Sequence, residues 1–548
     1  MEPTQIQRDI INDEGHTVVL ASPGSGKTFV MSEKIKKILG GETLPEYQGV
    51  IAISYTRKAS GNLKRRALSD GVQSKNSFFG TIDSFCLTQI ILPFGNFVMG
   101  YPADDLQPVL LSSLPKEKMI DFEWLTRDHP DYENINQQGW KNLKELFKDG
   151  KVLIESLELI ALHVIKNTRA CRNHLVARFR YVFIDEFQDT DTYTNAIFHE
   201  LIGLGLIGNV VGDVNQSIFG YAHKSSRYLE ELETAPGFTP YRLNENFRCS
   251  IPIINYSNRL LHPNCQILES DEETVKLIQV NGDEEAVAEY LDHHIERDCE
   301  ERSITNMKDV AILVRNGITQ TYIDNNLDYP HRVIETTVLD QDLNPRSRLY
   351  GLLLQFYFDN EKSYIGVLDE FTDYDLLTKN QRKRLLILKE EIRLVDEIDI
   401  EDDFPHLFKS VADIVLPKYD DGDASDNLIV VLGDKRMLDT YRPLTSNEVV
   451  IMTLHKAKGL EFDLVYHLNM NEFEIPFKLY ENYQAVYPYE TQDLDLHYVG
   501  VTRARKACFL ITSTQRHNGK GELKMSQPSV FLSRNGVDEL REDFAYGF

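Results

Sequence analysis

The chain has 548 residues, of which 42% are hydrophobic and 26% are charged, proportions typical of a globular protein with several domains. Its formal net charge of -26 excludes a uniformly basic surface, so nucleic acid must bind, if at all, in a local basic groove. The 6 cysteines form no CxxC pair and no Cys/His cluster with metal-ligand spacing, which indicates reduced thiols. We find no signal-peptide or membrane-span pattern, and we therefore expect a cytoplasmic protein that does not bind a membrane.

The first predicted elements are short buried strands that alternate with helices. A Gly/Ser/Pro loop follows the first strand, and a helix with apolar residues at helical spacing follows the loop. The four predicted strands lie at residues 17–20, 50–53, 181–184 and 210–212. This alternation predicts a parallel sheet with crossover helices.

A second pattern of the same kind begins near Tyr241 and predicts a second α/β domain. Its predicted strands lie at residues 310–314, 449–452 and 464–466. Two mostly helical stretches interrupt the scheme, and we interpret them as insertions. The predicted boundaries are 1–93 with 178–240 for the first domain, 94–177 for its insertion, 241–360 with 443–548 for the second domain, and 361–442 for the reduced second insertion.

The loop after the first strand predicts a nucleotide site. Its residues are Ala21, Ser22, Pro23, Gly24, Ser25, Gly26, Lys27 and Thr28. Glycines let backbone N–H groups surround phosphates, and the following helix N-terminus favours their charge. Lys27 is expected to contact the β and γ phosphates, and the Thr28 hydroxyl to bind Mg²⁺. A tight structural turn is the alternative, and the strand–loop–helix context argues against it.

The strand at residues 181–184 ends in two carboxylates, Asp185 and Glu186. The carboxyl ends of parallel strands are where α/β sheets bind ligands. Asp185 suits Mg²⁺ coordination through water, and Glu186 suits a base that orients and deprotonates an attacking water. An apolar strand that ends in Asp-Glu can also be a simple strand end, but the phosphate loop in the same chain favours catalysis.

With these motifs placed, the chain resembles superfamily 1 helicases of the UvrD/Rep/PcrA group from about Gln7 to about Arg516. The most specific segment is DEFQDT at residues 185–190. Three more follow in the family's order: GDVNQSIFGY at 212–221, TLHKAKGLEF at 453–462 and YVGVTRA at 498–504. The resemblance implies two RecA-like domains, ATP and Mg²⁺ in the cleft between them, and movement along single-stranded DNA in the 3′ to 5′ direction.

The resemblance also assigns residues around the nucleotide. Gln7 would bind the adenine edge, with Gln5 as the alternative, and Phe247 would stack on the adenine. Glu461 would hold the ribose. The γ-phosphate would be contacted by Gln216, Arg248 and Arg503.

The DNA track is also assigned by resemblance. The residues are Tyr55, Thr56 and Arg57 at a strand end, Thr81 and Phe85 in a second loop, the aromatic pair Phe219 and Tyr221, and His455. Core packing is the commoner explanation for any one aromatic. Tyr55 and Tyr221 are favoured, because the matching family positions stack on bases.

The chain departs from the usual helicases of this group in two ways. It is shorter, chiefly in the second insertion, so duplex unwinding is less strongly predicted than DNA-stimulated ATPase activity. Asp495 stands where the family often carries an arginine.

The chain also resembles the helicase-like subunit of Gabija antiphage systems, which implies an OLD-family-like partner nuclease. The alternative function is therefore a DNA-end-sensing ATPase that switches such a partner, and a P-loop enzyme unrelated to nucleic acid is a third interpretation.

Overall fold

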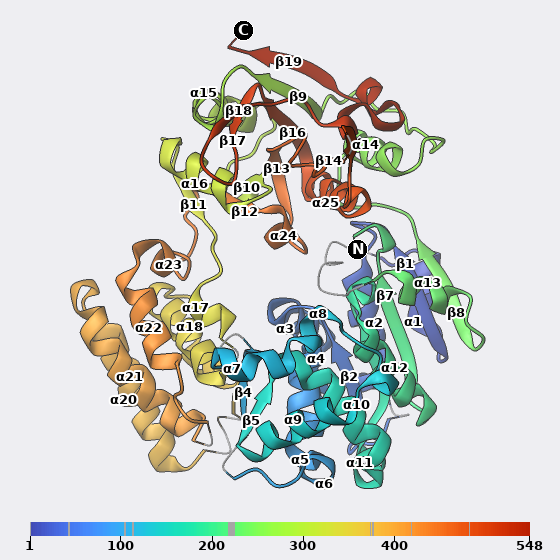
Figure 1. The fold of residues 1–548 in the computed structure, drawn as a ribbon, viewed down its shortest axis with the longest axis vertical. Helices are drawn as coiled ribbons and strands as arrows, with labels where there is room; N and C mark the ends of the chain where they lie inside the picture. The colour runs from blue at the N-terminus through green and yellow to red at the C-terminus, as the bar shows by residue number, and fades with distance from the viewer. Residues whose placement is uncertain are drawn as a thin grey trace.

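The computed structural model describes residues 2–41, 44–103, 106–111, 114–216, 225–342, 344–372, 374, 377–417, 419–481 and 483–547. The chain folds into three lobes (Figure 1). Two lobes each contain a parallel sheet, and the third, coloured yellow to orange, is helical throughout its described part. The predicted α/β class with two parallel sheets and helical insertions is confirmed.

The first sheet has six parallel strands in the order β3-β2-β6-β7-β1-β8. They are β1 (His16–Ala21), β2 (Gly49–Ile53), β3 (Phe78–Gly80), β6 (Phe179–Ile184), β7 (Ile207–Gly212) and β8 (Phe238–Leu243). The strands β1, β2, β6 and β7 were predicted from their apolar runs, because inner parallel strands are buried on both faces. The edge strands β3 and β8 were not predicted, since β3 has only three residues and β8 is largely exposed.

Helices cover both faces of the first sheet. One face is covered by α1 (Gln5–Asn12), α2 (Lys27–Gly40) and α3 (Arg57–Ala67). The other is covered by α4 (Ile82–Phe85), α10 (Leu157–Asn167), α12 (Thr192–Gly203) and α13 (Arg227–Glu233). This arrangement leaves the carboxyl ends of the strands at one edge of the lobe.

The predicted first insertion does not have a hydrophobic core of its own. Leu143 and Leu159 share one core with Val182 of the sheet. The elements of this segment are α5 (Leu92–Phe94), α6 (Asn96–Met99), β4 (Gln107–Val109), α7 (Lys116–Met119), α8 (Trp124–Arg127), α9 (Gln137–Lys148), β5 (Lys151–Leu153) and α11 (Arg169–Arg178). The segment therefore thickens one side of the first lobe.

The second sheet has seven parallel strands in the order β11-β12-β10-β13-β16-β9-β19. They are β9 (Val275–Val280), β10 (Val310–Val314), β11 (His331–Val333), β12 (Val449–Thr453), β13 (Phe462–His467), β16 (Ala504–Ser513) and β19 (Glu542–Tyr546). The surrounding elements are α14 (Ile251–Leu261), α15 (Glu284–Glu301), α16 (Gly317–Asn326), α24 (Leu454–Ala457), α25 (Glu490–Thr502) and the hairpins β14 (Leu479–Glu481) with β15 (Gln484–Val486) and β17 (Gln515–His517) with β18 (Leu523–Met525). The predicted strands of this domain correspond to β10, β12 and β13.

The third lobe is a helical unit with its own core. Its helices are α17 (Val338–Gln341), α18 (Pro345–Phe358), α19 (Tyr364–Leu368), α20 (Lys379–Leu394), α21 (Ile400–Val415), α22 (Ala424–Gly433) and α23 (Lys435–Asp439). Leu339 and Leu353 belong to the same core as Phe404, so the unit begins before the predicted boundary at residue 361. The other domain boundaries stay predictions.

The acidic run at residues 420–423 is partly used inside the third lobe. Asp421 accepts a hydrogen bond of 2.6 Å from the Tyr350 hydroxyl and lies 3.5 Å from Arg346. These contacts tie Asp421 into the interior of the lobe. Among the described residues, no helix is both long and apolar enough to cross a membrane.

Candidate nucleotide site

The loop between β1 and α2 has the backbone geometry of a phosphate-binding loop. Gly24 (φ 69°) and Gly26 (φ 90°) adopt left-handed conformations, which glycine enters without steric strain. Gly26 caps α2 without a side-chain hydrogen bond to the first turn. The N-terminal N–H groups of a helix carry positive character and suit phosphate oxygens.

Two segments far from the loop in sequence press closely against its glycines. A Cβ atom on Gly24 would lie 2.3 Å from Asn246 Oδ1, and a Cβ atom on Gly26 would lie 2.8 Å from Gln7 Nε2. Gln7 donates a hydrogen bond of 3.1 Å to the Ser25 carbonyl, whereas Gln5 donates one of 2.8 Å to Asp9 on the surface. Of the two predicted glutamines, the structure therefore places Gln7 against the loop.

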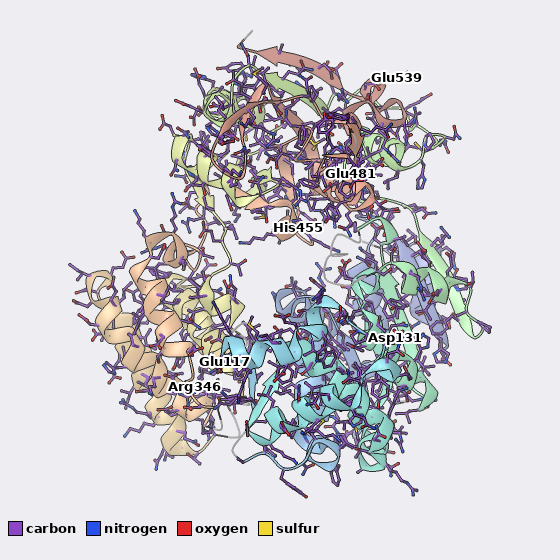
Figure 2. All side chains as sticks on the ribbon, in the orientation of Figure 1. Glu117, Asp131, Arg346, His455, Glu481 and Glu539 are labelled. Carbon is purple, nitrogen blue, oxygen red and sulfur yellow. The ribbon has the colours of Figure 1, made fainter. Side chains whose placement is uncertain are left out.

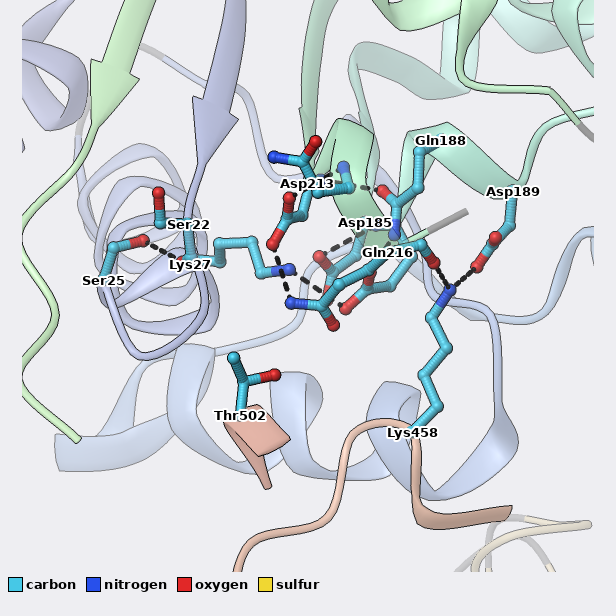
Figure 3. A network of polar contacts seen from close by, with 12 residues as sticks. Ser22, Ser25, Lys27, Asp185, Gln188, Asp189, Asp213, Gln216, Lys458 and Thr502 are labelled. Atoms are coloured by element: carbon cyan, nitrogen blue, oxygen red, sulfur yellow. Dashed lines mark hydrogen bonds and ion pairs between the residues drawn. The ribbon is translucent and has the colours of Figure 1, made fainter. Parts of the chain in front are cut away.

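The two carboxylates at the end of β6 lie at the loop lysine, and Figure 3 shows Asp185 on the side to which Lys27 points. Lys27 Nζ lies 3.5 Å from Glu186 Oε1. Burial and the neighbouring Glu186 raise the pKa of Asp185 to about 7. Burial alone would raise the pKa of Glu186, but Lys27 and then Lys458 outweigh it and lower that pKa to about 2. Glu186 is thus the ionised member of the pair.

A buried glutamine joins the ends of β6 and β7. The amide nitrogen of Gln188 donates to Glu186 Oε2, and its amide oxygen accepts a 2.9 Å hydrogen bond from the backbone N–H of Asp213. The side chain of Gln216 donates 2.7 Å to Asp213. These bonds hold the carboxylates and Gln216 in one network, because Asp185, Gln188, Asp213 and Gln216 are buried and need partners.

Two basic side chains of the second lobe reach this network. Arg503, which is 2% exposed, donates a 3.1 Å hydrogen bond from Nη2 to Gln216 Oε1. Burial and Arg248 lower the pKa of Arg503 to about 10. Lys458 Nζ lies 2.6 Å from Asp189 Oδ2 and 2.5 Å from the Gln216 carbonyl (Figure 3). The site therefore spans both sheet lobes.

The remaining predicted nucleotide residues lie beside the same loop. The backbone N–H of Phe247 donates 3.0 Å to the Gly24 carbonyl, and its ring is 46% exposed. Arg248 forms a 2.6 Å ion pair with Glu461 and a 3.4 Å hydrogen bond to the Thr502 carbonyl. An exposed ring next to the loop is free of core packing and can stack on a base.

Thr28 and Asp185 fit a magnesium ion by their chemistry. A hydroxyl and a carboxylate are hard oxygen donors of the kind that Mg²⁺ prefers. The carboxyl of Asp185 is buried beside Glu186, and a bound divalent cation would offset that burial and repulsion.

The predicted DNA residues fall into two groups by their placement. Tyr55 and Thr56 follow β2, and Tyr55 is 37% exposed. The Thr56 hydroxyl caps α3 by accepting a hydrogen bond of 3.1 Å from the Ala59 N–H. Thr81 caps α4 by accepting 3.3 Å from the Ser84 N–H. The Arg57 side chain, Phe219 and Tyr221 lie outside the described residues.

Phe85 is not a surface residue, and its assignment to the DNA track is wrong. Its ring is fully buried, 5.4 Å from the Phe78 ring and 6.4 Å from the Phe179 ring. An aromatic ring in such a cluster has no face for a base. Its position in α4 points it at the sheet, because α4 lies against the sheet face.

His455 lies on α24, at the side of the second sheet lobe that faces the other lobes (Figure 2). Burial, followed by Arg315 and Lys458, lowers its pKa to about 4. The imidazole is therefore neutral at physiological pH and can both donate and accept hydrogen bonds.

Lys458 had no predicted role, although its contacts join the two sheet lobes. It belongs to the TLHKAKGLEF segment. Its position directly before Gly459, at the end of the short helix α24, is the only local signal. Its partner Asp189 lies 269 residues earlier in the chain. Sequence reasoning missed the contact because the two residues belong to different lobes.

A phosphate loop and carboxylates in one parallel-sheet lobe, completed by arginines from a second, define a nucleoside triphosphatase with its site between two lobes. Comparison with known proteins agrees with this class. The model of the UvrD/REP helicase N-terminal domain matches residues 3–98 and 102–235, and that of the UvrD-like helicase C-terminal domain matches residues 353–515. The chain belongs to the UvrD/Rep helicase family, a family of ATP-dependent enzymes that act on DNA.

Three relatives show how far the similarity extends. Gabija protein GajB of Bacillus cereus is 24% identical over 96% of this chain and 98% of the relative. The ATP-dependent DNA helicase Rep of Buchnera aphidicola is 23% identical over 97% of this chain and 96% of the relative. The ATP-dependent DNA helicase PcrA of Staphylococcus aureus is 22% identical over 96% of this chain and 85% of the relative.

Proposed function

We propose that the protein hydrolyses ATP in the cleft between its two sheet lobes and uses the energy to move along single-stranded DNA from 3′ to 5′. The observation that carries this proposal is the contact of Arg503 and Lys458 with Gln216 and Asp189. Side chains of one lobe that reach the hydrolytic network of the other can couple the chemistry to relative movement of the lobes.

The proposed nucleotide contacts divide between the two lobes. The loop N–H groups and Lys27 hold the phosphates, and Gln7 and Phe247 hold the adenine. Glu461 holds the ribose, and its carboxylate is paired with Arg248 beside the loop. The remaining loop residues, Ala21 to Gly26, act through their backbone.

The proposed chemistry places Glu186 as the base for the attacking water. Its low pKa keeps the carboxylate ionised at physiological pH, and Gln188 holds one of its oxygens. Thr28 and Asp185 would hold Mg²⁺, which neutralises phosphate charge when it is bound. Arg248, Arg503 and Gln216 stabilise the charge of the transferring phosphoryl group.

The proposed DNA contacts are Tyr55, Thr56, Thr81 and His455, which follow or cap strand ends in the two lobes. Arg57, Phe219 and Tyr221 complete the proposed set.

The direct test is the ATP turnover of the wild type and of Lys27→Ala, each with and without a single-stranded DNA oligonucleotide. We expect DNA to stimulate turnover at least about tenfold, and the variant to lose at least about a hundredfold, because a phosphate-binding cation is removed. Turnover that depends on Lys27 but ignores DNA would contradict the DNA-coupled motor.

A second candidate function is a DNA-end-sensing ATPase that switches a partner nuclease in antiphage defence. The similarity to Gabija protein GajB over 98% of that relative favours it. The two functions differ in processive movement. A motor displaces streptavidin from a biotinylated 3′ or 5′ tail in an ATP-dependent reaction, whereas a switch leaves it in place.

A further inference from the structure

The core of the second sheet lobe contains three linked polar side chains that the proposed chemistry does not use. His467 ends β13, His497 lies on α25 and Tyr256 lies on α14, and all three are 0% exposed. Nε2 of His467 lies 3.1 Å from Nδ1 of His497, and the Tyr256 hydroxyl lies 3.5 Å from Nε2 of His497. Buried polar groups are stable only when they are paired, so these contacts constrain the elements that carry them.

The donor and the acceptor of each hydrogen bond can be assigned in turn, starting from His467. Nδ1 of His467 lies 3.0 Å from the Leu468 carbonyl, which can only accept, so Nδ1 carries the proton. Burial lowers the pKa of His467 to about 4, so its Nε2 is unprotonated and accepts from His497. Burial, then His467 and Arg541, lower the pKa of His497, and its Nε2 is left to accept from Tyr256.

The helix α25 lies unusually close to β13 at this point. A Cβ atom on Gly500 would lie 2.6 Å from His467 Cδ2 and 2.7 Å from Leu454 Cδ2, so a larger residue would force the helix away. The ring of Phe531 stacks on His497 with 6.4 Å between centroids. Packing and hydrogen bonding thus determine one position of α25 over the strand.

Each of the three elements leads to a residue of the nucleotide site. Glu461 directly precedes β13, Arg503 directly follows α25, and Arg248 lies three residues before the start of α14. At 1.5 Å per residue, His497 lies about 9 Å along the helix from Arg503. The cleft ends of these elements are also joined, because Phe462 donates 2.9 Å to the Arg503 carbonyl and Arg248 pairs with Glu461.

We propose that Tyr256, His497 and His467 form a positioning unit for ATP hydrolysis. The unit holds β13, α25 and α14 in register, so that Arg248, Glu461 and Arg503 meet the nucleotide as one rigid group. This inference rests on the proposed function, because it acts through the two arginines. A loss of register lowers kcat more than it weakens ATP binding, since the arginines act on charge that develops in the transition state.

The test compares two substitutions of His497 that separate its two hydrogen bonds. His497→Asn places an amide nitrogen near the position of Nδ1 and keeps the bond to His467, whereas His497→Gln extends past that position. We expect His497→Gln to lower the kcat of DNA-stimulated ATP turnover about tenfold, with the KM for ATP changed less than about threefold. His497→Asn is expected to keep kcat within about threefold of the wild type.

Two controls separate positioning from general stability. Tyr466→Phe removes a buried hydroxyl that donates 2.9 Å to Asp298 on the other face of β13, and it should lower the unfolding temperature without lowering kcat. Tyr256→Phe removes only the hydroxyl at the end of the unit. It should fold and lower kcat by about threefold, and so it keeps the test valid if His497→Gln does not fold.

Arg503→Ala distinguishes failure of the inference from failure of the proposed function. If Arg503→Ala keeps wild-type turnover, the proposed role of the arginine is wrong. If Arg503→Ala loses turnover while folded His497→Gln or Tyr256→Phe keeps the wild-type kcat, the positioning unit is refuted. In the double variant that combines Arg503→Ala with His497→Gln, we expect kcat to be less than about twofold lower than in Arg503→Ala alone, because the group being positioned is already absent.

Discussion

Glu186 and Lys27 form an ion pair at the phosphate loop, with 3.5 Å between Nζ and Oε1. Both residues could be predicted from the sequence, because each belongs to a short motif of consecutive residues. Whether a side chain is buried cannot be predicted from such a motif, since burial depends on residues that are far away in the sequence. Phe85 lies in a segment that resembles a DNA-contact loop, yet its ring packs between Phe78 and Phe179.

Glu186→Gln should abolish hydrolysis without abolishing ATP binding. The amide keeps the shape of the side chain but cannot accept the proton of the attacking water, so kcat should fall by about 10²- to 10⁴-fold. The measurement is DNA-stimulated turnover beside binding of a fluorescent ATP analogue. Glu448→Gln is the matched control, because Glu448 is also in an ion pair, with Arg332 at 2.8 Å, but outside the nucleotide site.

Because its histidines are buried, we predict that the folded chain becomes less stable in mild acid. The pKa of His467 is about 4 in the folded chain, below the ordinary histidine value of 6.5, so between these values the unfolded chain binds a proton that the folded chain does not. The free energy of unfolding should therefore fall by up to about 1.4 kcal/mol per pH unit for this residue as pH decreases from 6.5 towards 4. Calorimetry at pH 7.5 and 5.5 tests this, and a wild type equally stable at both would contradict it.

At the scale of elements, every strand that was predicted is an inner strand, whereas the edge strands and the inner strands β9 and β16 were not predicted. Inner parallel strands such as β2 and β10 are continuous apolar runs, since both of their faces are covered. The edge strand β19 is largely exposed and carries no such run. The start of the helical lobe at α17 was also missed, because its early helices differ from the preceding domain only in what they pack against.

Gly24→Ala tests the loop as an element. The substitution puts a Cβ atom at φ 69° and 2.3 Å from Asn246 Oδ1, so the loop must shift. We expect the KM for ATP to rise at least about tenfold, because the N–H groups no longer fit the phosphates. Gly203→Ala is the matched control, since a Cβ atom there meets nothing within 4 Å, and it should leave KM unchanged.

At the scale of the whole molecule, the two sheet lobes are joined by few but buried polar contacts. Lys458 and Asp189 form one of them, with side chains that are 7% and 1% exposed. Removing one member of a buried pair leaves the other charge uncompensated, which costs about 3–5 kcal/mol. The closed arrangement of the lobes should depend on this pair.

Lys458→Ala should therefore loosen the cleft. We expect a larger radius of gyration by small-angle X-ray scattering and at least about tenfold lower DNA-stimulated turnover. Lys506→Ala is the control, because Lys506 pairs with Asp463 within the second lobe and is partly exposed. An unchanged radius and turnover for Lys458→Ala would show that this contact does not hold the lobes together.

The sequence by itself determined the local chemistry of this protein: the phosphate loop, the carboxylate pair, the order of the family's motifs and the two parallel sheets. These features depend on residues that are neighbours along the chain. Only the tertiary structure decided that Gln7 rather than Gln5 meets the loop, that Phe85 is in the core, and that Arg503 and Lys458 reach the other lobe. The reason is physical: contact and burial are set by how distant segments pack, and no local pattern records them.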